Sequence, residues 1–378
     1  MTGAFRQFIL KIHGRCDLAC DYCYVYKHVD QTWRDRPARM SEGVVAAVAR
    51  RIAEHVRTHG LSRVRVVLHG GEPLLAGPDR IAATVEAIRT AVPAEVRFAV
   101  QTNGIRLDAG FLDLFRRYGV RVGVSLDGGL AGHNRHRLFP HGGASFERVA
   151  AALQLLGGER YRSIYGGVLC VIDLANDPVE VYRGLTAFRP PVIGLALPHG
   201  NWVHRPAGRP HDERLTPYGD WLVRVFDLWF DAPVREVAIR PFDAVIAMLL
   251  GGSSEIDGFG TTPTDAVTVD TDGSVQHSDS LKTTAAHAPE TGLNVLTDAF
   301  DDALALPLVR AERRSLATVP AKCRARPIVG LCGGGLFAHR FGPDGGFDHR
   351  SVYCADLIRL ITHVAARVRA GVAERHIT

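Results

Sequence analysis

The sequence FILKIHGRCDLACDYC, residues 8–23, joins a short apolar run, which predicts a β-strand, to a loop that carries three cysteines. Cys16, Cys20 and Cys23 bring three soft thiolates into this loop, and thiolates suit iron–sulfur clusters or zinc. A structural zinc site needs four ligands, whereas three thiolates leave one iron of a cubane cluster open to another molecule. We therefore expect a 4Fe–4S cluster here, with a zinc site completed by His13 as the alternative.

Around this loop, the first half of the chain alternates short apolar runs with helical patterns. Ser41 and Asp177 are suited to cap two of the helices, and Gly60 is suited to end one. Six strand–helix repeats predict an α/β fold with a parallel sheet that is open or rolled into a partial barrel. Strands are expected at residues 8–12, 64–68, 96–100, 120–124, 167–172 and 192–197, and helices at 41–59, 80–91, 108–118, 145–156 and from 177 onward.

Polar or glycine-rich segments follow each of the first four predicted strands. The carboxyl ends of parallel strands lie at one edge of a sheet, and α/β proteins place their functional groups there. We therefore expect one functional mouth formed by residues 16–23, 69–73, 101–104 and 125–128. After about residue 200 the pattern changes to a β-hairpin around residues 270–273 and a helix over residues 298–313.

Composition narrows the class of protein. The 378 residues carry a net charge of +5 and suit one large domain with a smaller appendage. The positive charge is diffuse, so no nucleic-acid partner is expected. No apolar stretch is long enough for a membrane span and the start lacks a secretory signal, so we expect a cytoplasmic protein without a membrane partner.

The seven cysteines are an odd number, which argues against a disulfide framework in a cytosolic chain. Six of them form two groups near opposite ends of the sequence, which indicates two metal sites. Cys170 stands alone in an apolar strand and is expected to be a small buried core residue.

The cysteine loop, with Tyr22 before its last cysteine, resembles the hallmark of the radical S-adenosylmethionine (SAM) superfamily. The resemblance extends to GGEP at residues 70–73, to SLDG at 125–128 and to HNRHR at 133–137. It implies that the cysteines hold a SAM-binding 4Fe–4S cluster, and it fits an arginine paired with the carboxylate of SAM. By this match the residues that contact SAM are Tyr22 near the adenine, Gly70, Gly71 and Glu72 at the amino end, Asn103 at the same mouth, and Ser125 and Arg137 at the ribose and carboxylate.

The second cysteine group resembles the C-terminal SPASM domain of peptide-maturing radical SAM enzymes. Two cysteines of that family's core are replaced, by Arg326 and Leu336, and Ser278 stands where an upstream cysteine belongs. The losses predict that the first auxiliary cluster of that family is absent. A second 4Fe–4S cluster would keep three ligands, with a fourth from His339, Asp344, water or substrate. A degenerate site with zinc or nothing is the alternative. The three ligands are Cys323, Cys332 and Cys354.

Asp279 follows Ser278 directly. In sulfatase-maturing relatives an acid at the matching position is proposed to accept a proton from the substrate, so Asp279 is a candidate catalytic residue. An exposed aspartate in a turn is the alternative.

Over nearly its whole length the chain resembles the FxsB-type peptide maturases, through KIHGRCDLACDYCYVYKHVDQTWRDRP, VVLHGGEPLLAG and CGGGLFAHRF…SVYCADL. The resemblance implies a partial (β/α)6 TIM-like barrel in residues 1–225, a bridging region with a hairpin and a helix in 226–320, and a small SPASM-like domain in 321–378. It implies modification of a ribosomally made precursor peptide, in which a 5′-deoxyadenosyl radical abstracts hydrogen and a side-chain crosslink of the cyclophane kind forms. The implied partners are a short precursor peptide and a flavodoxin or ferredoxin-like electron donor.

Two alternatives stay open at this point. One is oxidation or epimerisation of a residue without a crosslink. The other is a non-catalytic peptide-binding protein that contains zinc.

Overall fold

The structure is a computed structural model that describes residues 3–254, 256–313 and 316–375. The chain divides into two units, each assembled from separate stretches of sequence. The first unit comprises Met1–Leu126, His133–Val168 and Asp265–Ala311, and the second comprises Asp127–Gly132, Leu169–Thr264 and Glu312–Thr378. The fold is α/β, as predicted, and a partial TIM-like barrel is consistent with it. The sheet is mixed and not wholly parallel, because β8, β9 and β10 pair antiparallel. The domain limits expected after residues 225 and 320 stay a prediction.

Strands of the first unit follow the order β10-β9-β8-β1-β2-β3-β4. Neighbours from β8 through β1 to β4 pair in parallel, whereas β8, β9 and β10 pair antiparallel. The parallel arrangement brings the carboxyl ends of β1 to β4 to one edge, which is where the predicted mouth lies. The bounds are β1 Gln7–His13, β2 Arg63–Gly70, β3 Glu95–Thr102, β4 Arg121–Ser125, β8 Ala266–Val269, β9 Ser274–Gln276 and β10 Glu290–Asn294.

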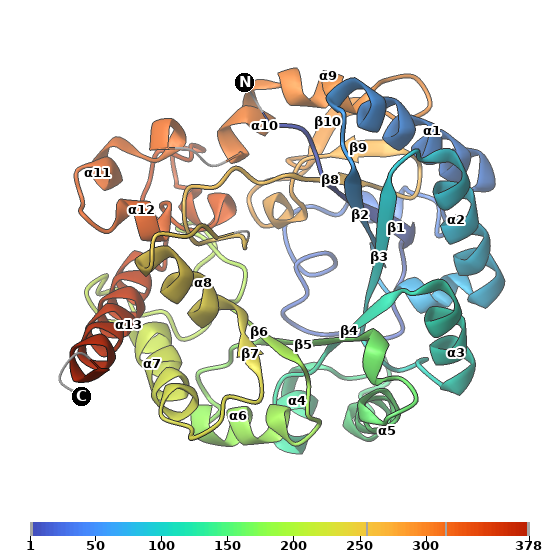
Figure 1. Ribbon diagram of the computed structural model, residues 1–378. Coiled ribbons are helices and arrows are strands. Elements are labelled where there is room, and N and C mark those ends of the chain that lie inside the picture. The colour runs from blue at the N-terminus through green and yellow to red at the C-terminus, as the bar shows by residue number, and fades with distance from the viewer. Residues whose placement is uncertain (1–2, 255, 314–315, 376–378) are drawn as a thin grey trace. The chain divides into compact units, whose positions relative to one another are not determined.

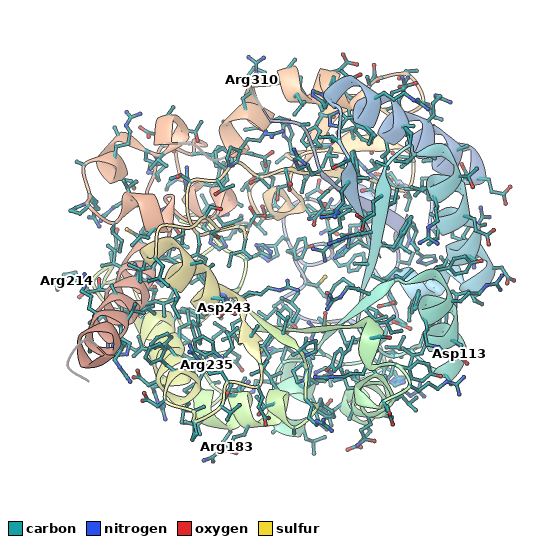
Figure 2. All side chains as sticks on the ribbon, in the orientation of Figure 1. Asp113, Arg183, Arg214, Arg235, Asp243 and Arg310 are labelled. Atoms are coloured by element: carbon teal, nitrogen blue, oxygen red, sulfur yellow. The ribbon has the colours of Figure 1, made fainter. Side chains whose placement is uncertain are left out.

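Helices α1, α2 and α3 lie in a row along one side of these strands (Figure 1). The hydroxyl of Ser41 accepts a hydrogen bond from the backbone N–H of Val44 at 3.2 Å and so caps α1, while Gly60, with φ of +59°, ends it. Asp113 on α3 points outward (Figure 2) and pairs with Arg160 at 2.8 Å, an exposed contact that adds little stability. The helices are α1 Glu42–His59, α2 Pro78–Ala91, α3 Ala109–Tyr118, α5 Phe146–Gly157 and α9 Phe300–Ala305.

Two long helices of the second unit, α7 and α13, pack side by side (Figure 1). Gly219 on α7 permits this approach, since a Cβ there would lie 2.8 Å from the carbonyl oxygen of Asp356. Strands β6 and β7 of this unit pair in parallel. The bounds are β6 Val192–Ala196, β7 Ala238–Ile239, α6 Pro178–Thr186, α7 Pro217–Phe230, α8 Arg240–Leu249, α11 Ala321–Arg324, α12 Val329–Cys332 and α13 Cys354–Arg375.

The remaining elements are of two kinds. Some connect the two units along the chain, and the others are short 3-10 helices. Strand β5 and helices α4 and α10 contain residues of both units. Among the helices of the described residues, none is long and apolar enough to cross a lipid bilayer. The bounds are β5 Tyr165–Val171, α4 Leu130–His136, α10 Pro307–Glu312, η1 Thr32–Arg34, η2 Pro73–Ala76, η3 Arg162–Ile164, η4 Asp279–Thr283, η5 Leu316–Thr318 and η6 Phe337–Arg340.

The six predicted strands, the hairpin and the five early helices are all present, with ends shifted by a few residues. Cys170 is buried in β5, as expected. The helix expected over residues 298–313 is wrong as a single element, because it divides into α9 and α10 at Leu306, whose ψ of 134° is extended. Pro307 follows, and a proline disfavours the helical conformation in the residue before it. The sequence analysis also missed α4 and β10, which are short and contain glycine, and it did not identify the longer helices α7, α8 and α13.

Candidate functional site

The cysteine loop leaves the carboxyl end of β1 and turns tightly back on itself. The backbone N–H of Cys23 donates to the carbonyl of Cys20 at 3.2 Å, and that of Leu18 donates to the sulfur of Cys16 at 3.4 Å. All three cysteines are half-buried thiols. Burial raises the pKa of Cys16 to about 12 and also raises that of Cys23, so a nearby positive charge is needed to keep them as thiolates.

The spacing of the three sulfur atoms separates the two metal hypotheses. Among the described residues, one group of at least three metal-ligating side chains has all of its ligand atoms within 4.8 Å of one another. The three cysteines are not in that group, so their sulfur atoms are spread more widely. Sulfur ligands of one zinc ion would lie about 3.8 Å apart, given a Zn–S bond of about 2.3 Å. The wider spread suits a cluster. His13, the other possible zinc ligand, has its Nδ1 atom 3.3 Å from the backbone nitrogen of Arg15.

The two glycines at the end of β2, Gly70 in the strand and Gly71 directly after it, lie against the segment that carries the cysteine loop. A Cβ on Gly70, whose φ is +141°, would fall 2.1 Å from the carbonyl oxygen of His13, and one on Gly71 would fall 1.8 Å from the hydroxyl of Tyr26. The N–H of Gly71 donates to the same His13 carbonyl at 2.9 Å. These glycines therefore hold the cysteine loop against β2, a reason that sequence reasoning did not supply.

Glu72 is fully buried and joins the loop after β2 to the loop after β3. Its carboxylate accepts hydrogen bonds from Thr102 Oγ1 at 2.7 Å, from the N–H of Asn103 at 2.7 Å and from the N–H of Leu74 at 2.9 Å. Burial raises the pKa of Glu72 to about 7. Both carboxylate oxygens already accept bonds within the protein, which favours a positioning role over direct contact with an amine. Its assignment as a SAM contact stays a prediction.

Asn103 extends from the end of β3 to the cysteine loop. Its Nδ2 atom donates to Asp17 at 2.8 Å and lies 3.6 Å from the sulfur of Cys16. Arg106 also pairs with Asp17, at 3.0 Å. Asp17 therefore links the cysteine loop to the segment after β3, and its position between two cysteines was the available signal that the sequence analysis did not use.

Tyr22 and Arg137 come together beside the cysteine loop. The guanidinium of Arg137, a buried residue directly after α4, lies 5.6 Å from the centre of the Tyr22 ring, within the range of a cation–π contact. Ser125, at the end of β4, accepts a hydrogen bond from Gln101 at 3.1 Å. His133 instead contacts Ser145 at 3.0 Å, at the start of α5, so this part of the HNRHR segment has a structural role.

Asp279 is half-buried and pairs with buried charged residues, so it is not an exposed turn aspartate, and its catalytic role stays a prediction. Its carboxylate pairs with Lys11 at 2.5 Å, and Lys11 also pairs with Asp270 at 3.1 Å. Burial alone would raise the pKa of Asp270, but the charges of Lys11 and Arg36 outweigh it and lower that pKa to about 2. Burial, and then the nearby Asp279, raise the pKa of Tyr24 well above its usual value. The sequence analysis missed Lys11, Arg36 and Tyr24.

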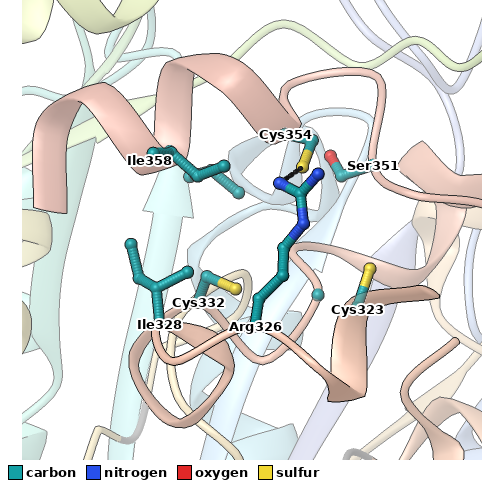
Figure 3. A pocket seen from close by; sticks show the side chains of 9 residues that line it. Cys323, Arg326, Ile328, Cys332, Ser351, Cys354 and Ile358 are labelled. Atoms are coloured by element: carbon teal, nitrogen blue, oxygen red, sulfur yellow. Dashed lines mark hydrogen bonds between the residues drawn. The ribbon is translucent and has the colours of Figure 1, made fainter. Parts of the chain in front are cut away.

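The second cysteine group lines a small pocket, partly open to solvent, within the second unit (Figure 3). Cys323, Cys332 and Cys354 come from α11, α12 and the start of α13. Arg326 projects among them, and its Nη1 atom lies 3.7 Å from the sulfur of Cys354. The remaining lining is largely apolar, with Ile328, Ser351, Leu357 and Ile358.

The ligands expected to complete this site do not line the pocket as described. His339 is buried with its ring 4.9 Å from that of Tyr353, and Asp344 is exposed and pairs with His349 at 2.8 Å. Arg340, also buried, instead builds the glycine turn, because its guanidinium donates to the carbonyls of three successive glycines at 2.7–3.2 Å. These are Gly333, Gly334 and Gly335.

Comparison with known proteins agrees with this geometry. Residues 10–178, which include the cysteine loop and the ends of β2 to β4, match the model of the Radical SAM superfamily. This part of the chain is a radical SAM domain. Its cofactors are accordingly SAM and a 4Fe–4S cluster, and the chain is an enzyme. The alternative of a non-catalytic zinc protein is therefore wrong.

Three similarities extend beyond this domain. The cysteine-type anaerobic sulfatase-maturating enzyme of Clostridium novyi is 24% identical over 277 residues, covering 70% of this chain and 71% of that protein. Native anSMEcpe with bound AdoMet and Cp18Cys peptide has a TM-score of 0.81 at 21% identity, covering 97% of this chain and 99% of the other. SuiB of Streptococcus suis, bound to the precursor peptide SuiA, has a TM-score of 0.61 at 12% identity, covering 93% and 76%. These similarities do not reach the FxsB-type assignment, which stays a prediction.

Proposed function

We propose that this radical SAM enzyme modifies a side chain of a ribosomally made precursor peptide and forms a crosslink of the cyclophane kind. The observation that carries the proposal is the cysteine loop, where Cys16, Cys20 and Cys23 share one mouth with the side chains of Asn103 and Arg137. The peptide substrate is supported by the fold, since anSMEcpe and SuiB have both been solved with bound peptides.

The side chains at the cysteine loop are of the types that a 4Fe–4S cluster and SAM need. The three cysteines would hold the cluster, and Arg137, Tyr22, Ser125, Asn103, Gly70, Gly71 and Glu72 would bind SAM or shape its site. When bound, the cluster and SAM together supply hydrogen-atom abstraction from an unactivated carbon. The chain's contribution is to orient the substrate and to exclude water, and a flavodoxin or ferredoxin-like protein would deliver the electron that starts each turnover.

Asp279 is the proposed proton acceptor. Removal of one hydrogen atom, one proton and one electron means that the substrate loses two hydrogen atoms in total. Lys11, whose positive charge is maintained by Asp279 and Asp270 despite its burial, holds the Asp279 carboxylate in place through an ion pair. The cysteine pocket, with Cys323, Cys332 and Cys354, would hold a second 4Fe–4S cluster that takes the electron.

The proton-acceptor role predicts a specific defect in Asp279→Asn. The variant should still cleave SAM, but product formation should fall by about 10²–10⁴-fold, because general-base catalysis is lost. Asp272→Asn, in the same hairpin region and 35% exposed, is the control and should retain activity. Equal product from both variants, measured by mass spectrometry, would remove Asp279 from the mechanism.

Oxidation of one residue without a crosslink is the second candidate. Two observations favour it: the sequence similarity to a cysteine-type anaerobic sulfatase-maturating enzyme, and the position of the half-buried Asp279 beside Lys11. Epimerisation differs from both reactions in leaving the peptide mass unchanged.

The deciding experiment uses a short peptide encoded beside the gene for this chain. The anaerobic enzyme is incubated with this peptide, SAM and a reductant, and the product is fragmented by tandem mass spectrometry. A crosslink gives a loss of two hydrogens and suppresses fragmentation between the joined residues, whereas oxidation without a crosslink leaves that fragmentation intact. An unmodified peptide, with SAM cleaved normally, would count against this substrate class.

A further inference from the structure

A cluster of two histidines and an aspartate lies outside the cysteine sites in the first unit. His55 and His59 are four residues apart on the last turns of α1 and therefore share one face. Asp301, in the first turn of α9, lies between them, with its Oδ1 atom 2.9 Å from His55 Nδ1 and 2.7 Å from His59 Nε2. The radical SAM chemistry described above uses none of the three.

His55 is the residue that points to a ligand. It is 2% exposed and packs against the rings of Phe5, Phe8 and Phe300. Its Nδ1 atom faces Asp301 but has no partner in good hydrogen-bond geometry. Its Nε2 atom lies 3.2 Å from the carbonyl oxygen of Phe5. A proton on Nε2 would be donated to that carbonyl, leaving the Nδ1 lone pair directed at the cluster.

We propose that His55, His59 and Asp301 bind one divalent transition-metal ion of the zinc class. Two imidazoles and a carboxylate are the ligand types that such ions prefer, and the three ligand atoms already lie within 4.8 Å of one another. The present separations need to widen to about 3.3 Å around an ion with bonds of about 2.0 Å. The side chains of His59 and Asp301 are 27% and 37% exposed, so water can fill a fourth position.

The ion would join the carboxyl end of α1 to the start of α9. The other explanation is a hydrogen-bonded His–Asp–His contact without metal, in which His55 Nε2 accepts from the N–H of Phe5 at 3.0 Å and Nδ1 donates to Asp301. The two explanations require opposite tautomers of His55 and make different predictions for metal uptake.

The test uses the cluster-loaded enzyme, treated with a chelator to remove loosely bound ions and then titrated anaerobically with Co²⁺ and Zn²⁺. The proposal predicts one equivalent of tight uptake, with the visible absorption of Co²⁺ in a nitrogen–oxygen site and a rise in melting temperature. His59→Gln and Asp301→Asn should both lose this equivalent while retaining their iron content.

His363→Gln is the matched control, because His363 pairs with Asp227 at 2.7 Å in a histidine–aspartate contact outside the triad. This control should take up metal like the parent enzyme. The proposal is overturned if the parent takes up no equivalent, or if His59→Gln takes up as much as the parent. Iron content and SAM cleavage, measured in the same samples, report separately on the proposed radical chemistry.

Discussion

The two cysteine sites of this enzyme are built in opposite ways. In the cysteine loop, Cys16, Cys20 and Cys23 come from one short turn after β1 and have polar neighbours such as Asn103 and Arg137. In the cysteine pocket, the three cysteines come from three helices and have a largely apolar lining with one arginine, Arg326. The loop is suited to bind a polar cofactor at an open iron, whereas the pocket is suited to enclose a cluster that only exchanges electrons.

Removing the cysteines of each site in turn is the strongest test of this division. Replacing Cys16, Cys20 and Cys23 by alanine should abolish SAM cleavage, whereas replacing Cys323, Cys332 and Cys354 should leave SAM cleavage intact and stop product formation. Each triple variant should lose about four iron atoms per chain. SAM cleavage that survives loss of the loop cysteines would mean that the cysteine loop does not hold the SAM-binding cluster.

Arg137 tests whether the polar surroundings of the loop bind SAM. Arg137→Lys keeps the charge but loses the paired donors, and we expect SAM to bind about 10-fold to 100-fold more weakly, on the scale of about 1.5–3 kcal/mol for hydrogen bonds to charged groups. Arg135→Lys, at an exposed position in α4, should bind SAM normally. Isothermal titration under anaerobic conditions measures both affinities, and equal values would remove Arg137 from the SAM site.

Arg326 tests the character of the pocket. Arg326→Cys would supply a fourth thiolate, and Arg326→Gln would remove only the positive charge near Cys354. A cluster in the pocket should show a lower reduction potential in both variants, because loss of the positive charge stabilises the oxidised state. The change should be larger in Arg326→Cys, which also adds a negative thiolate. Redox titration followed by electron paramagnetic resonance measures this. Unchanged potentials would mean that no cluster lies beside Arg326.

Glu72 gives the smallest effect, a change in the pH dependence of stability. Its pKa is raised by burial from 4.5 to about 7, so the folded protein keeps a proton that the unfolded chain releases in this range. The contribution of Glu72 to stability is therefore full below pH 4.5 and falls as the pH rises to about 7. In Glu72→Gln, the free energy of unfolding measured with denaturant should fall less between pH 5 and pH 8 than it does in the parent enzyme. An unchanged pH profile would mean that Glu72 is ionised in the folded protein.

The difference between patterns that are local in sequence and contacts between distant residues explains which features the sequence could predict. The strands, the capped helices and the cysteine loop depend on local patterns, so Ser41, Gly60 and the spacing of the loop cysteines were sufficient to place them. The partners of Asp279 were not predictable, because Lys11 lies 268 residues away in sequence and meets it only through the pairing of β1 with β8. Arg326 stands where the resembled family has a core cysteine, but this replacement did not by itself predict that the arginine side chain would lie beside Cys354.

The packing of Gly71 against Tyr26 has a consequence for protein engineering. An added Cβ on Gly71 would lie 1.8 Å from the Tyr26 hydroxyl and 2.5 Å from the backbone carbonyl oxygen of Arg15, so the segment after β2 and the cysteine loop are best exchanged together. A chimera that transplants the loop from a relative without its matching glycine pair should misplace all three thiols at once. Efforts to alter the substrate of this enzyme are therefore better directed at other segments around the mouth.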